Sequence, residues 1–172
     1  MDLKSKFRHV ADFPKEGIDF IDITTVLNDS EAFREAIDLI AAEVDVDKCD
    51  VIIGSEARGF ILGAAVAYKL GKRFVPVRKP GKLPYKTIKG SYALEYGEDS
   101  LEMHIDAVNK GDRAVLVDDL LATGGTMGCV YDMTKELGAV VEKAIFLVEL
   151  KELPGRKYLT DKGIEVTAVV EM

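Results

Sequence analysis

An apolar, β-branched run that ends at two carboxylates constrains this chain more than any other feature. The run covers residues 115–117, Asp118 and Asp119 follow it, and small or hydroxyl-bearing residues continue to Thr126. A helical pattern begins at that point, so we expect a buried strand, an acidic strand end, a tight loop and a helix, in that order. This order is typical of the βαβ unit of α/β proteins.

The loop after the carboxylates has the composition of a phosphate-binding loop. Gly124 and Gly125 allow a tight turn that brings backbone N–H groups close to an anion, and Thr123 and Thr126 add hydroxyl donors. The positive end of the following helix points at the same place. The preceding carboxylates would repel a phosphate, so they suit vicinal hydroxyl groups instead. Together the two carboxylates and the loop after them predict a site for a ribose 5-phosphate. The alternative is a generic turn between strand and helix.

The rest of the chain alternates short apolar strands with helical patterns. We expect helices over 30–44, 59–70 and 126–137, strands over 51–53, 74–77, 114–119, 140–150 and 166–170, a loop over 79–90, and a hairpin within 91–105. This alternation predicts an α/β fold with a central, mostly parallel sheet flanked by helices. At 172 residues the chain is expected to form a single domain, 1–172. Ligands of such sheets bind at the carboxyl ends of the strands.

Charge and composition exclude several classes of partner. The formal net charge of -7 argues against binding to nucleic acid or to an anionic membrane, so an anionic ligand needs a local basic patch. Cys49 and Cys129 are far apart and are expected to be buried free thiols, as in a reducing compartment. The N-terminus has no apolar signal core, and the apolar stretch 60–68 is too short to span a bilayer. We therefore expect a cytoplasmic protein.

A second strand, turn and helix place Arg58 at the same edge of the sheet. The segment 53–60 resembles the carboxylate segment in layout, so Arg58 is a candidate ligand for a pyrophosphate or a base edge. The alternative is a surface arginine paired with Glu56.

The basic patch follows the strand over 74–77. Lys79 and Lys82, with Arg78, come directly after that strand end, where point charges could offset the negative charge on a leaving pyrophosphate. A solvated lysine loop is the alternative.

Two further segments carry candidate ligand contacts. Glu95 and Tyr96 stand beside Gly97, where a glutamate could exchange a proton with a bound base and a tyrosine could exclude water. Phe20 could stack on a planar ligand, although a core role fits it equally well. The two histidines lack partners at metal-ligand spacing.

Five segments together resemble the adenine phosphoribosyltransferase family, of the type I phosphoribosyltransferases, over nearly the whole chain. They are Phe-Pro-x-x-Gly-x-x-Phe-x-Asp-Ile-Thr at 13–24, Glu-Ala-Arg-Gly-Phe at 56–60, Arg-Lys-Pro-Gly-Lys-Leu-Pro at 78–84, Leu-Glu-Tyr-Gly at 94–97, and the carboxylate and Thr-Gly-Gly-Thr segment at 115–126. The resemblance implies the type I phosphoribosyltransferase fold, with an N-terminal hood of about residues 1–28 over the base and a flexible loop. It also implies a homodimer.

The resemblance further implies a reaction and a role for each candidate residue. Adenine and 5-phosphoribosyl 1-pyrophosphate (PRPP) would give AMP and pyrophosphate, with Mg²⁺ held by PRPP oxygens and water and by no protein ligand directly. Asp118 and Asp119 would hold the ribose hydroxyls, and Glu95 would act on the N7 of adenine. The 5-phosphate would lie on Ala122, Thr123, Gly124, Gly125 and Thr126, the pyrophosphate on Arg58, Lys79 and Lys82, and the base on Phe20 and the backbone near Asp19 and Ile21.

Two features of the resemblance bear on detail. In this family the peptide between Glu56 and Ala57 can be cis. Ile21 stands where several members of the family have a basic residue, which affects only the fine contacts of the base segment.

Two alternative functions remain at this point. A phosphoribosyltransferase for a 6-oxopurine such as xanthine or hypoxanthine usually presents a cation to the 6-oxygen, and here residues 146–150 offer none before Lys151. A PRPP- or purine-sensing regulator without catalysis usually carries a DNA-binding domain, which this acidic chain is not expected to contain.

Overall fold

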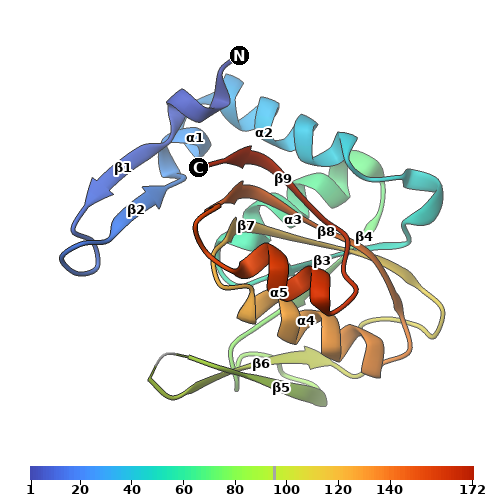
Figure 1. The fold of residues 1–172 in the computed structure, drawn as a ribbon. Coiled ribbons are helices and arrows are strands. Elements are labelled where there is room, and N and C mark those ends of the chain that lie inside the picture. Colours follow the sequence, from blue (N-terminus) through green and yellow to red (C-terminus); the bar gives the residue numbers. More distant parts are fainter. Residues whose placement is uncertain (95) are drawn as a thin grey trace.

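The chain forms a parallel sheet between two layers of helices, with a hairpin on either side of the sheet's carboxyl edge (Figure 1). The computed structural model describes residues 1–94 and 96–172. The strands of the main sheet are β3 (Val51–Ser55), β4 (Arg73–Val77), β7 (Arg113–Leu121), β8 (Val140–Glu149) and β9 (Val166–Glu171). They run parallel in the order β4-β3-β7-β8-β9, which confirms the α/β class.

The strand order reverses direction next to β3. From β3 the chain first adds β4 on one side and then returns to add β7 on the other side. Loops that leave β3 and β7 therefore diverge, and the space between them at the carboxyl ends is where open α/β sheets bind ligands.

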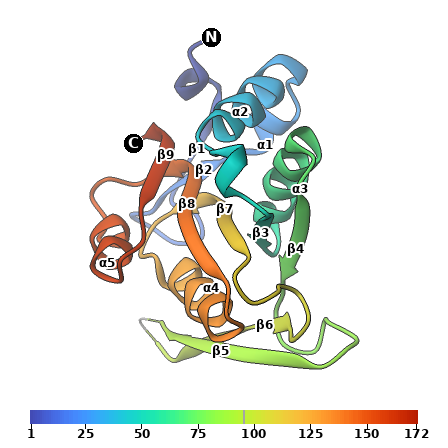
Figure 2. The same cartoon turned by 90° about the vertical axis from the view of Figure 1, so that its right-hand side faces the viewer.

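Helices cover both faces of the sheet (Figure 2). The helices are α2 (Ser30–Ala42) and α3 (Arg58–Leu70) on one face and α4 (Gly125–Glu136) and α5 (Gly155–Asp161) on the other. Ile52 of β3 packs toward α2 and α3, while its neighbours Val51 and Ile53 pack toward α4. Both faces of each central strand are thus buried, which explains their continuous apolar runs.

Two hairpins extend from the side on which the parallel strands end (Figure 1). The first pairs β1 (Arg8–Ala11) with β2 (Asp19–Asp22) and leads into the short helix α1 (Thr24–Leu27). The second pairs β5 (Thr87–Ala93) with β6 (Glu98–His104) and lies along α4. Short 3-10 turns occupy Leu3–Lys6 and Val46–Lys48.

Most of the predicted elements are confirmed, with one error. Asp29 caps α2 by accepting hydrogen bonds from the backbone N–H groups of Glu31 and Ala32, at 3.0 and 3.1 Å. Gly71, with a φ of 65°, ends α3 directly after the predicted last residue, Leu70. The predicted loop over 79–90 is wrong for residues 87–90, which belong to β5 because they pair with β6. The β1–β2 hairpin, α1 and α5 were not expected from the sequence.

Within residues 1–94 and 96–172, no helix combines the length and the apolar character needed to cross a bilayer. Both cysteines are buried free thiols, as expected.

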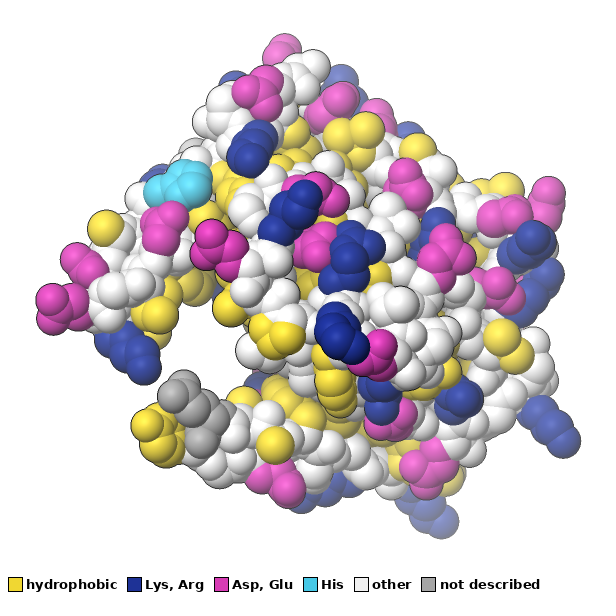
Figure 3. Space-filling view, in the orientation of Figure 1, with side chains coloured by type: hydrophobic (Ala, Val, Ile, Leu, Met, Phe, Trp, Pro, Cys, Tyr) yellow, Lys and Arg dark blue, Asp and Glu magenta, His cyan; other side chains and the backbone are white. Residues whose placement is uncertain are grey.

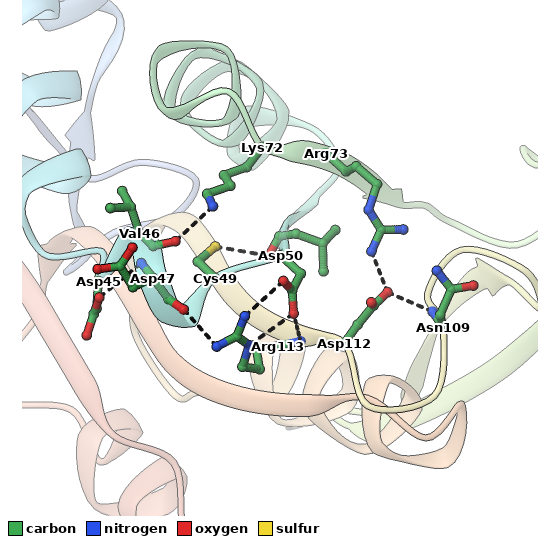
Figure 4. Close-up of polar contacts among 11 residues, drawn as sticks. Asp45, Val46, Asp47, Cys49, Asp50, Lys72, Arg73, Asn109, Asp112 and Arg113 are labelled. Carbon is green, nitrogen blue, oxygen red and sulfur yellow. Dashed lines mark hydrogen bonds and ion pairs between the residues drawn. The ribbon is translucent and has the colours of Figure 1, made fainter.

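Ion pairs join the amino ends of the central strands, on the edge opposite the predicted site (Figure 4). Arg113 begins β7, and its backbone N–H and Nε donate to Asp50 Oδ2, just before β3, at 2.8 and 3.1 Å. Arg73, at the start of β4, pairs with Asp112. These contacts fix the strands at one end, while loops of the other end are left for ligands.

The pKa of Asp50 gives a test of this amino-edge cluster. Hydrogen bonds from the side chain and backbone of Arg113 lower the pKa of Asp50 from 3.8 to about 2. A carboxyl whose pKa is lowered by folding stabilises the protein above pH 3.8, and this contribution is lost as the pH falls toward about 2. Asp50→Asn should therefore lower the melting temperature at pH 7, and the difference from the wild type should shrink between pH 4 and pH 2.

A matched control is Asp38→Asn, which removes an exposed pair with Lys69 on the helices. Exposed pairs contribute little, so this change should leave the melting curve nearly unaltered. A deficit of Asp50→Asn that stays constant over the whole pH range would contradict the assignment.

Candidate functional site

Two carboxylates lie side by side, nearly buried, toward the carboxyl end of β7. Asp118 and Asp119 expose only 9% and 6% of their surface. Ser55 Oγ, at the end of β3, donates to Asp118 Oδ2 at 2.9 Å, and the backbone N–H of Asp119 donates to Asp118 Oδ1 at 2.9 Å. Burial, followed by the neighbouring charge of Asp119, raises the pKa of Asp118 well above its usual value.

The turn after β3 closes against these carboxylates and leaves no room for a side chain. A Cβ at Gly59 would lie 2.7 Å from Asp118 Oδ1 and 3.4 Å from Ser55 Oγ. The start of α3 can therefore approach β7 closely only because residue 59 is a glycine.

Arg58 points at the second carboxylate. Its Nε donates to Asp119 Oδ2, and its guanidinium carbon lies 5.9 Å from the centre of the Phe20 ring. The alternative of a pair with Glu56 is wrong, because Glu56 instead accepts from Arg78 Nε at 3.0 Å and from the backbone N–H of Lys79 at 3.1 Å. Arg58 thus connects the β1–β2 hairpin with β7.

The peptide between Glu56 and Ala57 is cis, as the resemblance implies.

The loop after β7 begins α4, as the sequence predicts. Gly124 has a φ of 85°, which favours glycine, and α4 starts at Gly125 with its N–H groups directed into the loop. The carbonyl of Ala122 accepts from the N–H of Gly155 at 3.0 Å, so α5 holds the back of the loop. A Cβ at Gly124 would lie 3.0 Å from the ring of Tyr158, which packs there.

These two turns enclose a polar cavity of about 210 Å³ at the strand switch. It is lined by Ser55, Glu56, Ala57, Arg58, Asp118, Asp119, Leu120 and Thr126. Adjacent carboxylates, a guanidinium and a helix N-terminus in one polar cavity can bind a ligand that carries both hydroxyl groups and phosphate.

The two predicted lysines differ in their surroundings. Lys79 is half-buried, and its ammonium group pairs with Asp99 of β6. Lys82 is exposed, three residues further along. The alternative of a fully solvated lysine loop is therefore wrong for Lys79.

The predicted base-binding residues lie on β2. Phe20 is partly exposed and makes an edge contact with the Phe13 ring, with centroids 5.1 Å apart. Asp19 is exposed beside His9, whose Nδ1 lies 2.8 Å from Asp19 Oδ2. The side chain of Ile21 is buried in the core, so only its backbone can reach a ligand. Glu95 lies outside the described residues.

An open hollow separates the β1–β2 hairpin from the β5–β6 hairpin (Figure 3). Since both hairpins extend from the carboxyl edge of the sheet, a ligand can reach that edge between them. In the described part of the chain, no three His, Cys, Asp or Glu side chains gather where they could hold a metal ion.

Several contacts in the site were not found from the sequence. Ser55 holds Asp118, Glu56 holds the backbone of Lys79, and Asp99 with Tyr92 holds the Lys79 ammonium group. Ser55 and Glu56 lie in the segment 53–60, whose sequence does not reveal these partners. The others depend on strand order and register, which no local pattern displays.

Comparisons with known proteins agree on one family. A family model described as a phosphoribosyl transferase domain matches residues 23–168. The adenine phosphoribosyltransferase of Acetivibrio thermocellus is 56% identical over 172 residues, which cover 99% of both chains.

Solved structures of the same description superimpose closely. The adenine phosphoribosyltransferase of Thermoanaerobacter pseudethanolicus has a TM-score of 0.95 at 50% identity. The match covers 99% of this chain and 98% of that chain. The enzyme from Saccharomyces cerevisiae, solved with adenine and an imino-altritol bisphosphate, has a TM-score of 0.90 at 36% identity, with 96% of this chain and 94% of that chain covered.

The carboxylate pair should cost stability, because two adjacent buried groups cannot both ionise without repulsion. A carboxyl whose pKa is raised by folding lowers the stability of the protein at every pH above its ordinary pKa of 3.8, so Asp118 opposes folding at neutral pH. In Asp118→Asn, the amide can donate to Ser55 Oγ and still accept from the N–H of Asp119. The variant should therefore melt higher at pH 7, by about 2–4 °C for each kcal/mol of repulsion removed.

The gain should diminish as the pH is lowered and Asp118 takes up its proton. Asp106→Asn, at an exposed turn, is the matched control and should not change the melting temperature. A lower melting temperature for Asp118→Asn at pH 7 would show that the buried charge is fully compensated.

Proposed function

This chain belongs to the adenine phosphoribosyltransferase family, and from that premise we propose how its residues carry out the reaction. The reaction is transfer of the 5-phosphoribosyl group from PRPP to adenine, which gives AMP and pyrophosphate in purine salvage. One observation carries the assignment: two carboxylates, a guanidinium and the N-terminus of α4 line one cavity.

Asp118 and Asp119 bind the 2- and 3-hydroxyl groups of the ribose. Their carboxylate oxygens accept hydrogen bonds from these hydroxyl groups. The 5-phosphate lies on the loop 122–126, where backbone N–H groups, that of Thr126 included, and the hydroxyl of Thr123 donate to it. Ribose and phosphate are thereby fixed on neighbouring parts of one strand and loop.

The pyrophosphate lies on the cationic side of the cavity. Arg58 offers a planar pair of donors, and Lys79 and Lys82 offer point charges from the loop after β4. Mg²⁺, when bound, neutralises pyrophosphate charge, and we propose that PRPP oxygens and water hold it rather than protein ligands. The cationic side chains stabilise the negative charge that collects on the leaving group.

Adenine enters beside Phe20. The ring stacks on Phe20, and backbone groups of Asp19 and Ile21 bind its edge, since the Ile21 side chain is directed into the core. The bond from ribose C1 to the pyrophosphate oxygen breaks, its electron pair leaves with pyrophosphate, and adenine N9 bonds to C1 from the opposite face. Adenine must lose one proton when N9 bonds to C1, and we propose that this proton leaves from N7 and passes to Glu95. The protein chiefly positions the two reactants and stabilises charge.

We also propose a homodimer in the cytoplasm. The dimer follows from the resemblance to the family, and the two buried free thiols suit a reducing compartment. Sedimentation of the purified chain gives its oligomeric state directly.

The choice of base tests the function. With PRPP and Mg²⁺, adenine should be consumed, while hypoxanthine, guanine and xanthine, assayed in parallel, should not, because residues 146–150 place no cation near a 6-oxygen. Turnover of an oxopurine in place of adenine would retain the PRPP site but refute the assignment of the base segment. PRPP binding without turnover of any base would favour a regulator.

The carboxylates test the site. Asp119→Asn should reduce turnover by about 100-fold or more, the loss typical when a preorganised polar contact at a reaction centre is removed. His104→Ala, on the β5–β6 hairpin outside the cavity, is the control and should stay close to wild-type turnover. Equal losses in the two variants would contradict the assignment of the carboxylates.

A further inference from the structure

We propose that Tyr92 and Asp99, on the β5–β6 hairpin, are positioning residues that hold the Lys79 ammonium group at a fixed place relative to the phosphate loop. The proposal rests on the function assigned above to Lys79 and to the loop 122–126. It adds two residues that touch no reactant themselves and that act through Lys79.

A continuous line of contacts joins the phosphate loop to Lys79. Thr126 Oγ1, in the first turn of α4, donates to the Tyr92 hydroxyl at 3.3 Å. The Tyr92 hydroxyl in turn donates to Asp99 Oδ2 at 3.1 Å, and Asp99 Oδ2 pairs with Lys79 Nζ. Each hydroxyl donates once along this line, so all of the contacts can be made at the same time.

The hairpin presents Tyr92 and Asp99 as a rigid pair. The two residues face each other across β5 and β6 in register, which places their side chains on the same face. The backbone N–H of Ser100 donates to Asp99 Oδ1 at 2.8 Å, so the second carboxylate oxygen is also fixed. Asp99 is therefore oriented before any ligand binds.

The ring of Tyr92 sets the spacing between the hairpin and the phosphate loop. A Cβ at Gly125 would lie 2.9 Å from Tyr92 Cδ2, so the ring rests directly on the backbone of the loop. The Tyr92 ring thus sets how closely the β5–β6 hairpin can approach the loop 122–126.

Lys79 is held at both ends. Its backbone N–H donates to Glu56 Oε1 at 3.1 Å, and its ammonium group pairs with Asp99. A free lysine side chain has many rotamers, and fixing them before binding removes an entropic cost from the reaction. The hydrogen bond to Asp99 also raises the pKa of Lys79, so the ammonium group keeps its proton.

The chemistry explains why this spacing matters. The 5-phosphate and the departing pyrophosphate belong to one ribose, so their binding groups must stand at one separation throughout the reaction. Tyr92 and Asp99 connect the loop 122–126, which binds the 5-phosphate, to Lys79, which binds the pyrophosphate. Adenine lies on the other side of the cavity, on β2, so substitution of Tyr92 or Asp99 should not affect its binding.

A double-mutant cycle tests the proposal. The variants are Asp99→Asn, Lys79→Met and the two combined, with Asp106→Asn as the control for loss of an exposed carboxylate. Asp99→Asn should lower kcat/KM for PRPP about tenfold or more, the effect of one charged hydrogen bond, with the KM for adenine unchanged. The combined variant should be no worse than Lys79→Met alone, because Asp99 acts only through Lys79.

Tyr92→Phe provides a second variant that keeps the ring on Gly125. It should lower kcat/KM for PRPP about threefold to tenfold, again without effect on the KM for adenine. This variant decides the question if Asp99→Asn does not fold.

The outcomes separate the two levels of the account. If the wild-type chain converts adenine but the losses in kcat/KM of the two single variants multiply in the combined variant, the positioning role is overturned and the proposed function stands. A drop in melting temperature with equal changes in the PRPP and adenine KM values would likewise assign the pair to stability alone. Failure of the wild-type chain to convert adenine would overturn both.

Discussion

The rest of the structure depends on two adjacent carboxylates buried at the carboxyl end of β7. Placing Asp118 and Asp119 there costs free energy, because two neighbouring charges lose water together. The fold offsets this cost from the neighbouring strand: Ser55 donates to Asp118, and Arg58 pairs with Asp119. Both come from β3 and the turn after it, and Gly59 lets that turn approach. The carboxylate pair therefore requires β3 to lie beside β7.

The two edges of the sheet have different roles: the amino edge joins the strands, and the carboxyl edge forms the cavity. At the amino edge, Arg113 and Asp50 fix β7 to β3 through hydrogen bonds between their side chains and backbone. At the carboxyl edge, the polar groups of the same strands and of the turns after them pair with each other and also line a cavity. A rigid amino edge lets the carboxyl edge hold groups that would otherwise repel one another. In the mechanism that we propose, catalysis depends mainly on groups that are already in position.

The sequence predicted what is local and missed what depends on pairing. The predicted strand, carboxylates, loop and helix over 115–137 are confirmed. This prediction was possible because the apolar run, the glycines and the hydroxyl residues that indicate them lie in one continuous segment. The alternative partner of Arg58 was wrong, because the choice between Glu56 and Asp119 depends on which strand lies next to β3. The prolines, glycines and lysines of residues 79–90 predict a loop, which is wrong for residues 87–90. In fact Gly90 is needed where β5 crosses α4, since a Cβ there would lie 2.6 Å from Cys129 Sγ.

The same limit applies to the hairpins that complete the site. Nothing local marks Tyr92 and Asp99 as a pair, since their contact follows from the register of β5 with β6. The β1–β2 hairpin escaped notice because Phe13-Pro14 and Gly17 interrupt its pattern, yet it presents Phe20 to Arg58. Strand order and register are set by the whole core, so the final assembly of the site required the structure.

The most direct test of the account is a crystal structure of this chain with AMP. We expect the ribose 2- and 3-hydroxyl groups within hydrogen-bond distance of Asp118 and Asp119, and the phosphate on the N–H groups of 122–126. A phosphate bound to Arg58 and Lys79, with the ribose turned away from the carboxylates, would contradict it.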